Sequence, residues 1–187
     1  MIKDLIKKAR TYRRFDESYE LKREDLLNLV DSARIASSGA NLQPLKYFIS
    51  FEKETNALIF DNLRWAGGFK DWDGPSEGER PTGYIVMVHD TNISKNPFWD
   101  HGLAAQNILL TAIESGIGGC MFASFDKSLH EKLNLSEKHN ILMVIALGKP
   151  VEEVEIVSVL EDGKTNYYRD ENKTHYVPKR SLEDIIL

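Results

Sequence analysis

Residues 100–121 read DHGLAAQNILLTAIESGIGGCM, and this stretch is the most informative part of the sequence for the fold. Its apolar residues cover more than one face of a helix that we expect over residues 98–115. A helix that is apolar on most sides is either central and buried or packed against a partner chain. We expect Gly116 to end this helix and residues 118–125 to form a short strand that runs into a loop.

The sequence on either side of this stretch predicts a mixture of helices and strands. Residues 84–88 and 141–147 are short apolar runs typical of buried strands, and Gly148 and Pro150 are expected to close the second. The remaining predicted elements are a strand over 45–51 and helices over 2–9, 23–36, 53–63 and 126–133. Because no regular βαβ repeat is present, the pattern favours an α+β fold, a sheet with helices packed on it.

Length and composition predict one globular domain over residues 1–187. The chain is 42% hydrophobic and 28% charged, and its net charge of -5 argues against nucleic acid or an anionic membrane as a general partner. A single cysteine excludes an internal disulfide, so a reducing cytoplasm is the simplest location. The first residues form no apolar signal core, and no uncharged run approaches the ~18 residues of a membrane span.

The last part of the chain, about 151–187, differs in composition from the rest. It begins acidic, continues polar and irregular, and ends with basic residues and a group of aliphatic side chains. Tyr167, Tyr168 and Tyr176 are unexpected in a free tail. We therefore interpret this segment as an arm that packs on another surface, such as a second subunit.

Basic residues gather near both ends of the chain. Arg10, Arg13 and Arg14 lie within five residues and next to Thr11, and Lys179 and Arg180 lie near the C-terminus. Arginine binds phosphate through two parallel N–H groups, so the two clusters could converge on one anion. The alternative interpretation is two separate, solvated basic patches.

Three further segments could contact a ligand. Residues 37–44 offer hydroxyl, amide and backbone groups, although an ordinary helix-to-strand loop has the same composition. Residues 116–124 are rich in glycine, which allows a ligand close to the backbone, and Cys120 within them is expected to be a buried, inert thiol. Residues 67–81 form a long irregular loop, and Trp65 and Trp72 beside and within it either serve function or fill the edge of the core.

Two pairs of histidine and aspartate suggest a different class of protein. His89 with Asp90, and Asp100 with His101, are residue types that bind divalent metals, which would indicate a metallohydrolase. The competing interpretation is that polar residues end a strand and that an acidic residue begins a helix, where the helix dipole favours it.

Four motifs, in order along the chain, together resemble the nitroreductase family of FMN-dependent oxidoreductases in its shorter form. They are RTYRRF at 10–15, ASSGANLQP at 36–44, DHGLAAQNILL at 100–110 followed by GIGGCM at 116–121, and VPKRSLEDII at 177–186. The chain departs from the family pattern at Leu45 and Met121, near the expected flavin and substrate positions. The resemblance spans nearly the whole chain.

The resemblance implies an α+β fold with a central, mostly antiparallel sheet flanked by helices, in an intertwined homodimer with FMN at the subunit interface. It implies that the phosphate and ribityl end of FMN is held by Arg10, Thr11, Arg13, Lys179 and Arg180. The residues implied to reach the flavin from the other subunit are Ser38, Gly39 and Asn41. Those implied to run past the isoalloxazine are Met121, Phe122, Ala123 and Ser124, with a backbone N–H near Ala123 facing N5.

The activity that the resemblance implies is reduction of an electron-poor small molecule with NADH or NADPH as electron donor. Nitroaromatics, quinones and enones are the expected acceptors, and the flavin rather than a side-chain nucleophile carries the hydride. The 67–81 loop, with Trp65 and Trp72, is expected to form the wall or lid of the substrate pocket. Other chemistry on the same fold, such as dehalogenation or flavin breakdown, remains open, as does a flavin-binding module without turnover.

Overall fold

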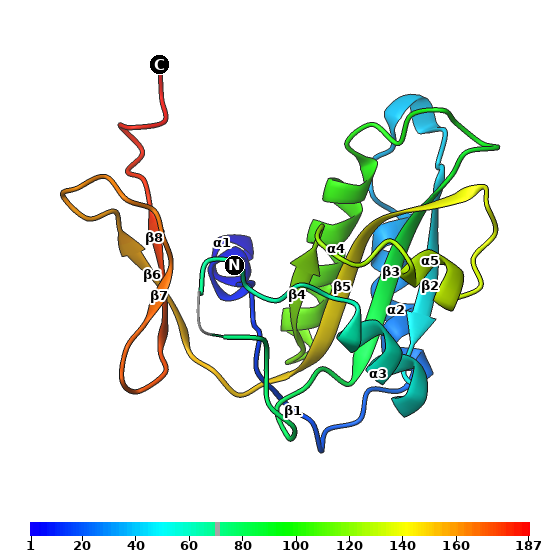
Figure 1. Cartoon of the computed structure of the whole chain (residues 1–187). Coiled ribbons are helices and arrows are strands. Elements are labelled where there is room, and N and C mark those ends of the chain that lie inside the picture. Colours follow the sequence, from blue (N-terminus) through cyan, green and yellow to red (C-terminus); the bar gives the residue numbers. More distant parts are fainter. Residues whose placement is uncertain (70–71) are drawn as a thin grey trace.

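The computed structural model describes residues 1–69 and 72–187, which form two sheets and a set of helices (Figure 1). The helices are α1 (Ile2–Lys8), α2 (Arg23–Arg34), α3 (Lys53–Asp61), α4 (Asp100–Glu114) and α5 (Leu129–Lys132), with a 3₁₀ turn η1 (Gly39–Asn41). The strands are β1 (Phe15–Asp16), β2 (Leu45–Ser50), β3 (Gly83–Asp90), β4 (Gly118–Phe122), β5 (His139–Pro150), β6 (Val154–Ser158), β7 (Tyr168–Arg169) and β8 (His175–Lys179). Most predicted elements are confirmed to within a few residues.

The larger sheet is antiparallel throughout. Its strands follow the order β1-β5-β3-β2, and β4 also pairs with β5. Helices α2 and α4 cover one face and α3 and α5 the other (Figure 1). The predicted α+β fold with a mostly antiparallel sheet is therefore confirmed.

Strand β3 explains how one sheet supports two cores. Side chains alternate between the faces of a strand, so Ile85 and Met87 join the cluster under α2 and α4. Tyr84, Val86 and Val88 join the cluster on the α3 side. Because both faces are covered, β3 is apolar almost without interruption, which is the pattern seen in the sequence.

The end of β5 differs from the sequence prediction. Gly148 does not close this strand, because it pairs with Gly118 of β4, and the strand continues to Pro150, which pairs with Phe15 of β1. A Cβ atom on Gly148 would lie 2.9 Å from atoms of the Phe15 side chain, so glycine here lets β1 approach. Pro150 is tolerated because it lies at the last position of the strand.

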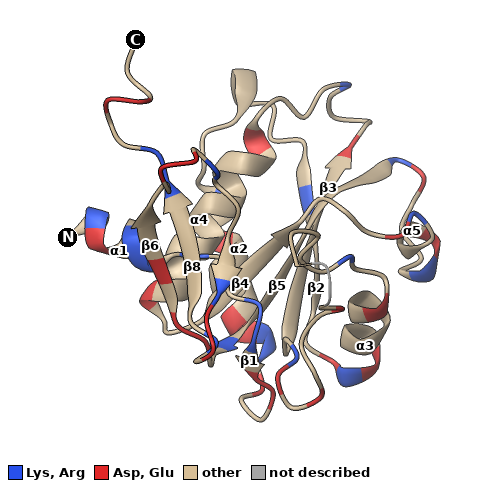
Figure 2. Cartoon of the chain, turned by 60° about the vertical axis from the view of Figure 1, so that its left-hand side comes forward, with Lys and Arg blue, Asp and Glu red and all other residues tan. Residues whose placement is uncertain are grey.

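Residues 151–187 form a separate three-stranded arm. Strand β8 pairs in parallel with β6 and antiparallel with β7, and the small sheet stands apart from the larger one (Figure 1). Helix α1 lies beside this arm in both views (Figures 1 and 2). The chain then ends in a tail that extends away from the sheets, with Leu182, Ile185 and Ile186 exposed. Within residues 1–69 and 72–187, no helix combines the length and apolar character needed to cross a membrane.

Candidate functional site

The N-terminal basic segment lies against the first half of β4. The Tyr12 N–H donates to the Gly119 carbonyl at 3.0 Å, and Thr11 forms an isolated β-bridge with Gly119. Arg10 folds back along α1, where its Nη2 donates to the Ile6 carbonyl at 2.6 Å. The buried Nε of Arg10 has no hydrogen-bond partner in the described part of the chain. This segment therefore presents an unused donor next to a glycine-rich strand.

Arg13 connects this segment to the arm. Its side chain is buried, with Nη1 3.5 Å from Nδ1 of His175 and the guanidinium 4.8 Å above the centre of the Tyr167 ring. His175 begins β8, the strand that ends at Lys179. The structure thus brings the N-terminal segment to the start of β8. Lys179 and Arg180 themselves are exposed.

Glu152 holds this junction together and was not identified from the sequence. Its side chain is 0% exposed, and its carboxylate accepts hydrogen bonds from the backbone N–H groups of Arg13 and, at 3.2 Å, Arg14. The other carboxylate oxygen lies 2.9 Å from Nη2 of Arg169. Glu152 and Arg13 are 139 residues apart, so no local pattern indicates their pairing.

The start of the 67–81 loop also docks on the arm. The Gly68 N–H donates to the Tyr167 hydroxyl at 3.1 Å, and the Arg169 guanidinium lies 4.5 Å from the centre of the Trp72 ring. Trp65, by contrast, is only 8% exposed and packs edge-on against Phe122 in the core. The burial of Trp65 supports the core alternative for this residue rather than an open pocket wall. Positions 70 and 71 of the loop lie outside the described residues.

Asp100 organises the loop that follows α2. At the start of α4, its carboxylate accepts hydrogen bonds from the Ser38 hydroxyl at 2.6 Å and the Gly39 N–H at 2.9 Å. The Gln43 N–H in turn donates to the Ser38 hydroxyl at 2.9 Å. Asn41 is exposed and adopts a positive φ of 55°. In the described residues of one chain, no hydrogen bond or ion pair joins this loop to residues 10–13.

Strand β4 is buried at every position except Met121. Met121 is 42% exposed, whereas Phe122 packs in the core against Trp65. Ala123 and Ser124 are exposed beyond the last pair of the strand. A ligand beside this segment would meet the Met121 side chain and the backbone, but not the Phe122 ring.

Cys120 is buried, as the sequence predicts. Burial raises the pKa of its thiol to about 12. A thiol with such a pKa is protonated at neutral pH and is a poor nucleophile.

The four residues of the metal hypothesis do not converge. Asp90 lies 3.7 Å from Nζ of Lys138 and 3.6 Å from Nε2 of His139, whereas Asp100 is engaged by the Ser38 loop. Among residues 1–69 and 72–187, no group of three or more potential metal-binding side chains comes together. The geometry therefore gives the metallohydrolase alternative no support.

We expect His175 to make stability depend on pH. Burial, together with the positive charges of Arg13 and Arg169, lowers the pKa of His175 to about 4. Between about pH 6.5 and pH 4 the histidine of the unfolded chain is protonated whereas His175 of the folded chain is neutral. The free energy of unfolding therefore falls as the pH falls through this range. At pH 5 the loss from this residue is about 2 kcal/mol relative to pH 7.5.

The measurement is urea unfolding of the parent and His175→Gln proteins at pH 7.5 and pH 5. Other groups titrate equally in both proteins, so the difference between the two pH dependences isolates His175. We expect the variant to lose less stability on acidification. An identical loss in the two proteins would contradict the assignment.

Part of the chain matches a known protein family. The family model described as "Nitroreductase family" matches residues 80–149, which include β3, α4, β4 and most of β5. Over these residues the chain is similar to the nitroreductase family.

Individual relatives extend the match beyond that range. A provisional NADH dehydrogenase/NAD(P)H nitroreductase of Archaeoglobus fulgidus is 25% identical over 143 residues, 72% of this chain and 77% of that protein. An iodotyrosine deiodinase of Thermotoga neapolitana is 27% identical over 94% of this chain and 97% of its own length. The structure of an FMN-dependent nitroreductase from Clostridium difficile R20291 superposes with a TM-score of 0.66, at 26% identity, over 82% of this chain and 89% of that one.

Proposed function

We propose that this protein is an FMN-dependent oxidoreductase that takes electrons from NADH or NADPH and passes them to an electron-poor small molecule. The observation that carries the proposal is the junction of residues 10–13 with β4 and β8. There, Arg13 meets His175 at the start of β8, and Tyr12 is hydrogen-bonded to Gly119 of β4, a strand whose outer residue Met121 is exposed. Support also comes from the Clostridium difficile neighbour, which is named as FMN-dependent.

The residues at this junction fit a phosphate group. Arg10 has a buried donor without a partner, and Lys179 and Arg180 are exposed cations at the end of the adjoining strand. The arginine and lysine side chains can only donate hydrogen bonds and the Thr11 hydroxyl can also donate one, so together they suit an anion with several acceptor oxygens. We therefore assign the FMN phosphate and ribityl end to the residues Arg10, Thr11, Arg13, Lys179 and Arg180.

The chain's own contribution is orientation and exclusion of water. FMN, when bound, supplies hydride acceptance and transfer. The Ala123 N–H forms no backbone hydrogen bond within the described part of the chain, so it is free to donate to a ring nitrogen beside β4. Met121 offers an apolar surface next to it.

A second copy of the chain completes the proposed site. Ser38, Gly39 and Asn41 do not reach the basic segment of their own chain, so we assign them to the FMN of a partner subunit. Exposed apolar side chains support this assembly, among them Trp99 before α4 at 82% exposure and the C-terminal tail. Large exposed apolar side chains in groups are typical of interaction surfaces.

The test uses purified protein from gel filtration, taken from the fraction that elutes at the mass of two chains. We expect a flavin absorption spectrum that NADH or NADPH bleaches in the absence of oxygen, because a bound flavin in an oxidoreductase accepts hydride from its donor. A flavin that neither nucleotide bleaches would leave only a binding module. A colourless protein that takes up no added FMN would overturn the cofactor assignment.

One observation favours a second candidate activity, reductive dehalogenation. The Thermotoga neapolitana relative that aligns over nearly the whole chain is named as an iodotyrosine deiodinase. Release of iodide from iodotyrosine by the pre-reduced protein, compared with consumption of a nitroaromatic, separates the two activities.

A further inference from the structure

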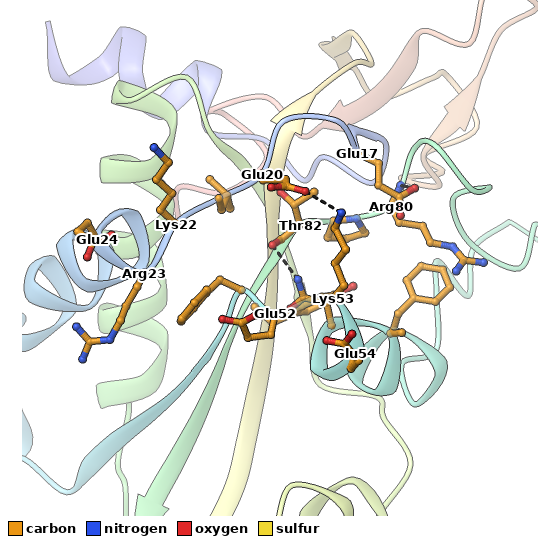
Figure 3. A pocket seen from close by; sticks show the side chains of 17 residues that line it. Glu17, Glu20, Lys22, Arg23, Glu24, Glu52, Lys53, Glu54, Arg80 and Thr82 are labelled. Carbon is orange, nitrogen blue, oxygen red and sulfur yellow. Dashed lines mark hydrogen bonds and ion pairs between the residues drawn. The ribbon is translucent and has the colours of Figure 1, made fainter.

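A second cavity lies away from the proposed cofactor site. It measures about 790 Å³, is open to solvent on one side, and is lined by the residues before and at the start of α2 and α3 and by the start of β3 (Figure 3). Leu21, Phe51 and Phe60 give it apolar walls, and Arg80, Thr82 and Tyr84 lie on the β3 side. None of its lining residues belongs to the set that we assign to FMN. Helix α2, with 12 residues and therefore about 18 Å long, separates this cavity from the Ser38 loop.

Two polar groups of this cavity have no partner in the described structure. The Tyr84 hydroxyl is fully buried and forms no hydrogen bond, and the same holds for Nε of Arg80. Burial raises the pKa of Tyr84, so its hydroxyl is a neutral donor. Buried polar groups are nearly always hydrogen-bonded, and an exception calls for an explanation.

Arg80 also lacks an ionic partner among the described residues. Its guanidinium lies 4.5 Å from the centre of the Phe60 ring, with no carboxylate within ion-pair distance. The nearby acidic residues are used elsewhere: Glu17 accepts the Gly78 N–H, and Glu20 pairs with Lys53 at 2.8 Å (Figure 3). Arg80 and Tyr84 therefore line the cavity with a buried guanidinium nitrogen and a buried hydroxyl that have no partner among the described residues.

We propose that this cavity binds a small aromatic monocarboxylate, with its carboxylate on Arg80 and Tyr84 and its ring between Phe51 and Phe60. A carboxylate accepts hydrogen bonds from both donors at once, which a neutral apolar ligand cannot do. The aromatic walls favour a flat apolar body.

The charge around the cavity disfavours a ligand with more than one negative charge. Glu17, Glu20, Glu24, Glu52 and Glu54 line it together with four cations. A phosphate ester or nucleotide carries more negative charge and would meet this acidic rim, where like charges repel. The proposed ligand is thus distinct from FMN and from NADH or NADPH.

The test is calorimetric titration of the purified holoprotein with 2-naphthoate. We expect saturable binding that weakens about tenfold in Tyr84→Phe and at least as much in Arg80→Gln, because each variant loses a hydrogen bond to a charged group. The uncharged analogue 2-naphthamide should bind more weakly than 2-naphthoate. Arg34→Gln, which removes an exposed arginine outside the cavity, is the charge-matched control and should bind as the parent does.

Thermal stability separates a binding role from a structural one. Because the Tyr84 hydroxyl has no partner in the free protein, Tyr84→Phe should keep or raise the melting temperature while it loses affinity. Unchanged affinity in both cavity variants, or no binding by the parent, would overturn the proposal. Equal binding of 2-naphthamide, or of acetate, would overturn the ligand class. If Tyr84→Phe does not fold, Arg80→Gln decides alone, since Arg80 lies at the surface end of the cavity and is partly exposed.

Discussion

Replacing Glu152 with alanine should lower the free energy of unfolding by about 3–5 kcal/mol, the usual cost of removing one partner from a buried ion pair. The Glu152 side chain is fully buried and serves three donors, the N–H groups of Arg13 and Arg14 and the guanidinium of Arg169. Without the carboxylate, these donors stay buried and unpaired. The measurement is chemical unfolding in urea at pH 7.5.

Glu153→Ala is the matched control for this experiment. Glu153 is the next residue along the chain and is exposed, and it meets His175 through its backbone carbonyl, which alanine retains. Glu153→Ala should therefore change stability by less than about 0.5 kcal/mol. We further expect protease to cut Glu152→Ala faster within residues 151–187, because the arm loses an anchor to the N-terminal segment. Equal stability of the two variants would contradict the anchoring role.

The fold could be predicted from the sequence because its signals are local. Residues 84–88 are all apolar, because their side chains point alternately to the two buried faces of the sheet. The apolar 98–115 segment is followed by Gly116, which has a positive φ of 75°. The sequence predicts the ends of an element less well where strands distant in sequence determine them. Strand β5 continues through Gly148 to Pro150 because β4 and β1 pair with it there, and neither partner is adjacent in sequence.

The site was only partly predictable for the same reason. Arginines near a helix suggested an anion site, but the buried carboxylate that holds Arg13 in place lies 139 residues away. Asp100 was considered as a metal ligand or a helix-start residue, and its actual hydrogen-bond partners lie 61 and 62 residues earlier, at Gly39 and Ser38. A single sequence contains no signal for such distant pairs.

Replacing Arg13 with alanine should weaken FMN retention by about 100-fold, which corresponds to about 3 kcal/mol for charge-assisted hydrogen bonds to a phosphate. This expectation depends on the proposed function. The Arg13 guanidinium has five N–H donors and meets His175 with only one nitrogen, so it retains donors for a ligand between β4 and β8. The measurement is the ratio of flavin to protein absorbance after gel filtration, followed by titration of the apoprotein with FMN.

Arg14→Ala separates binding from folding in this experiment. Arg14 is the next residue, but its guanidinium is occupied by Glu79, with Nε 2.6 Å from Oε2, so it has little capacity left for a phosphate. Both variants lose one positive charge and one partly or fully buried arginine, so both should lose stability. Only Arg13→Ala should also lose its flavin, because only that side chain lies at the junction with the arm. If both variants elute equally yellow, Arg13 serves the arm alone and the phosphate rests on Arg10, Lys179 and Arg180.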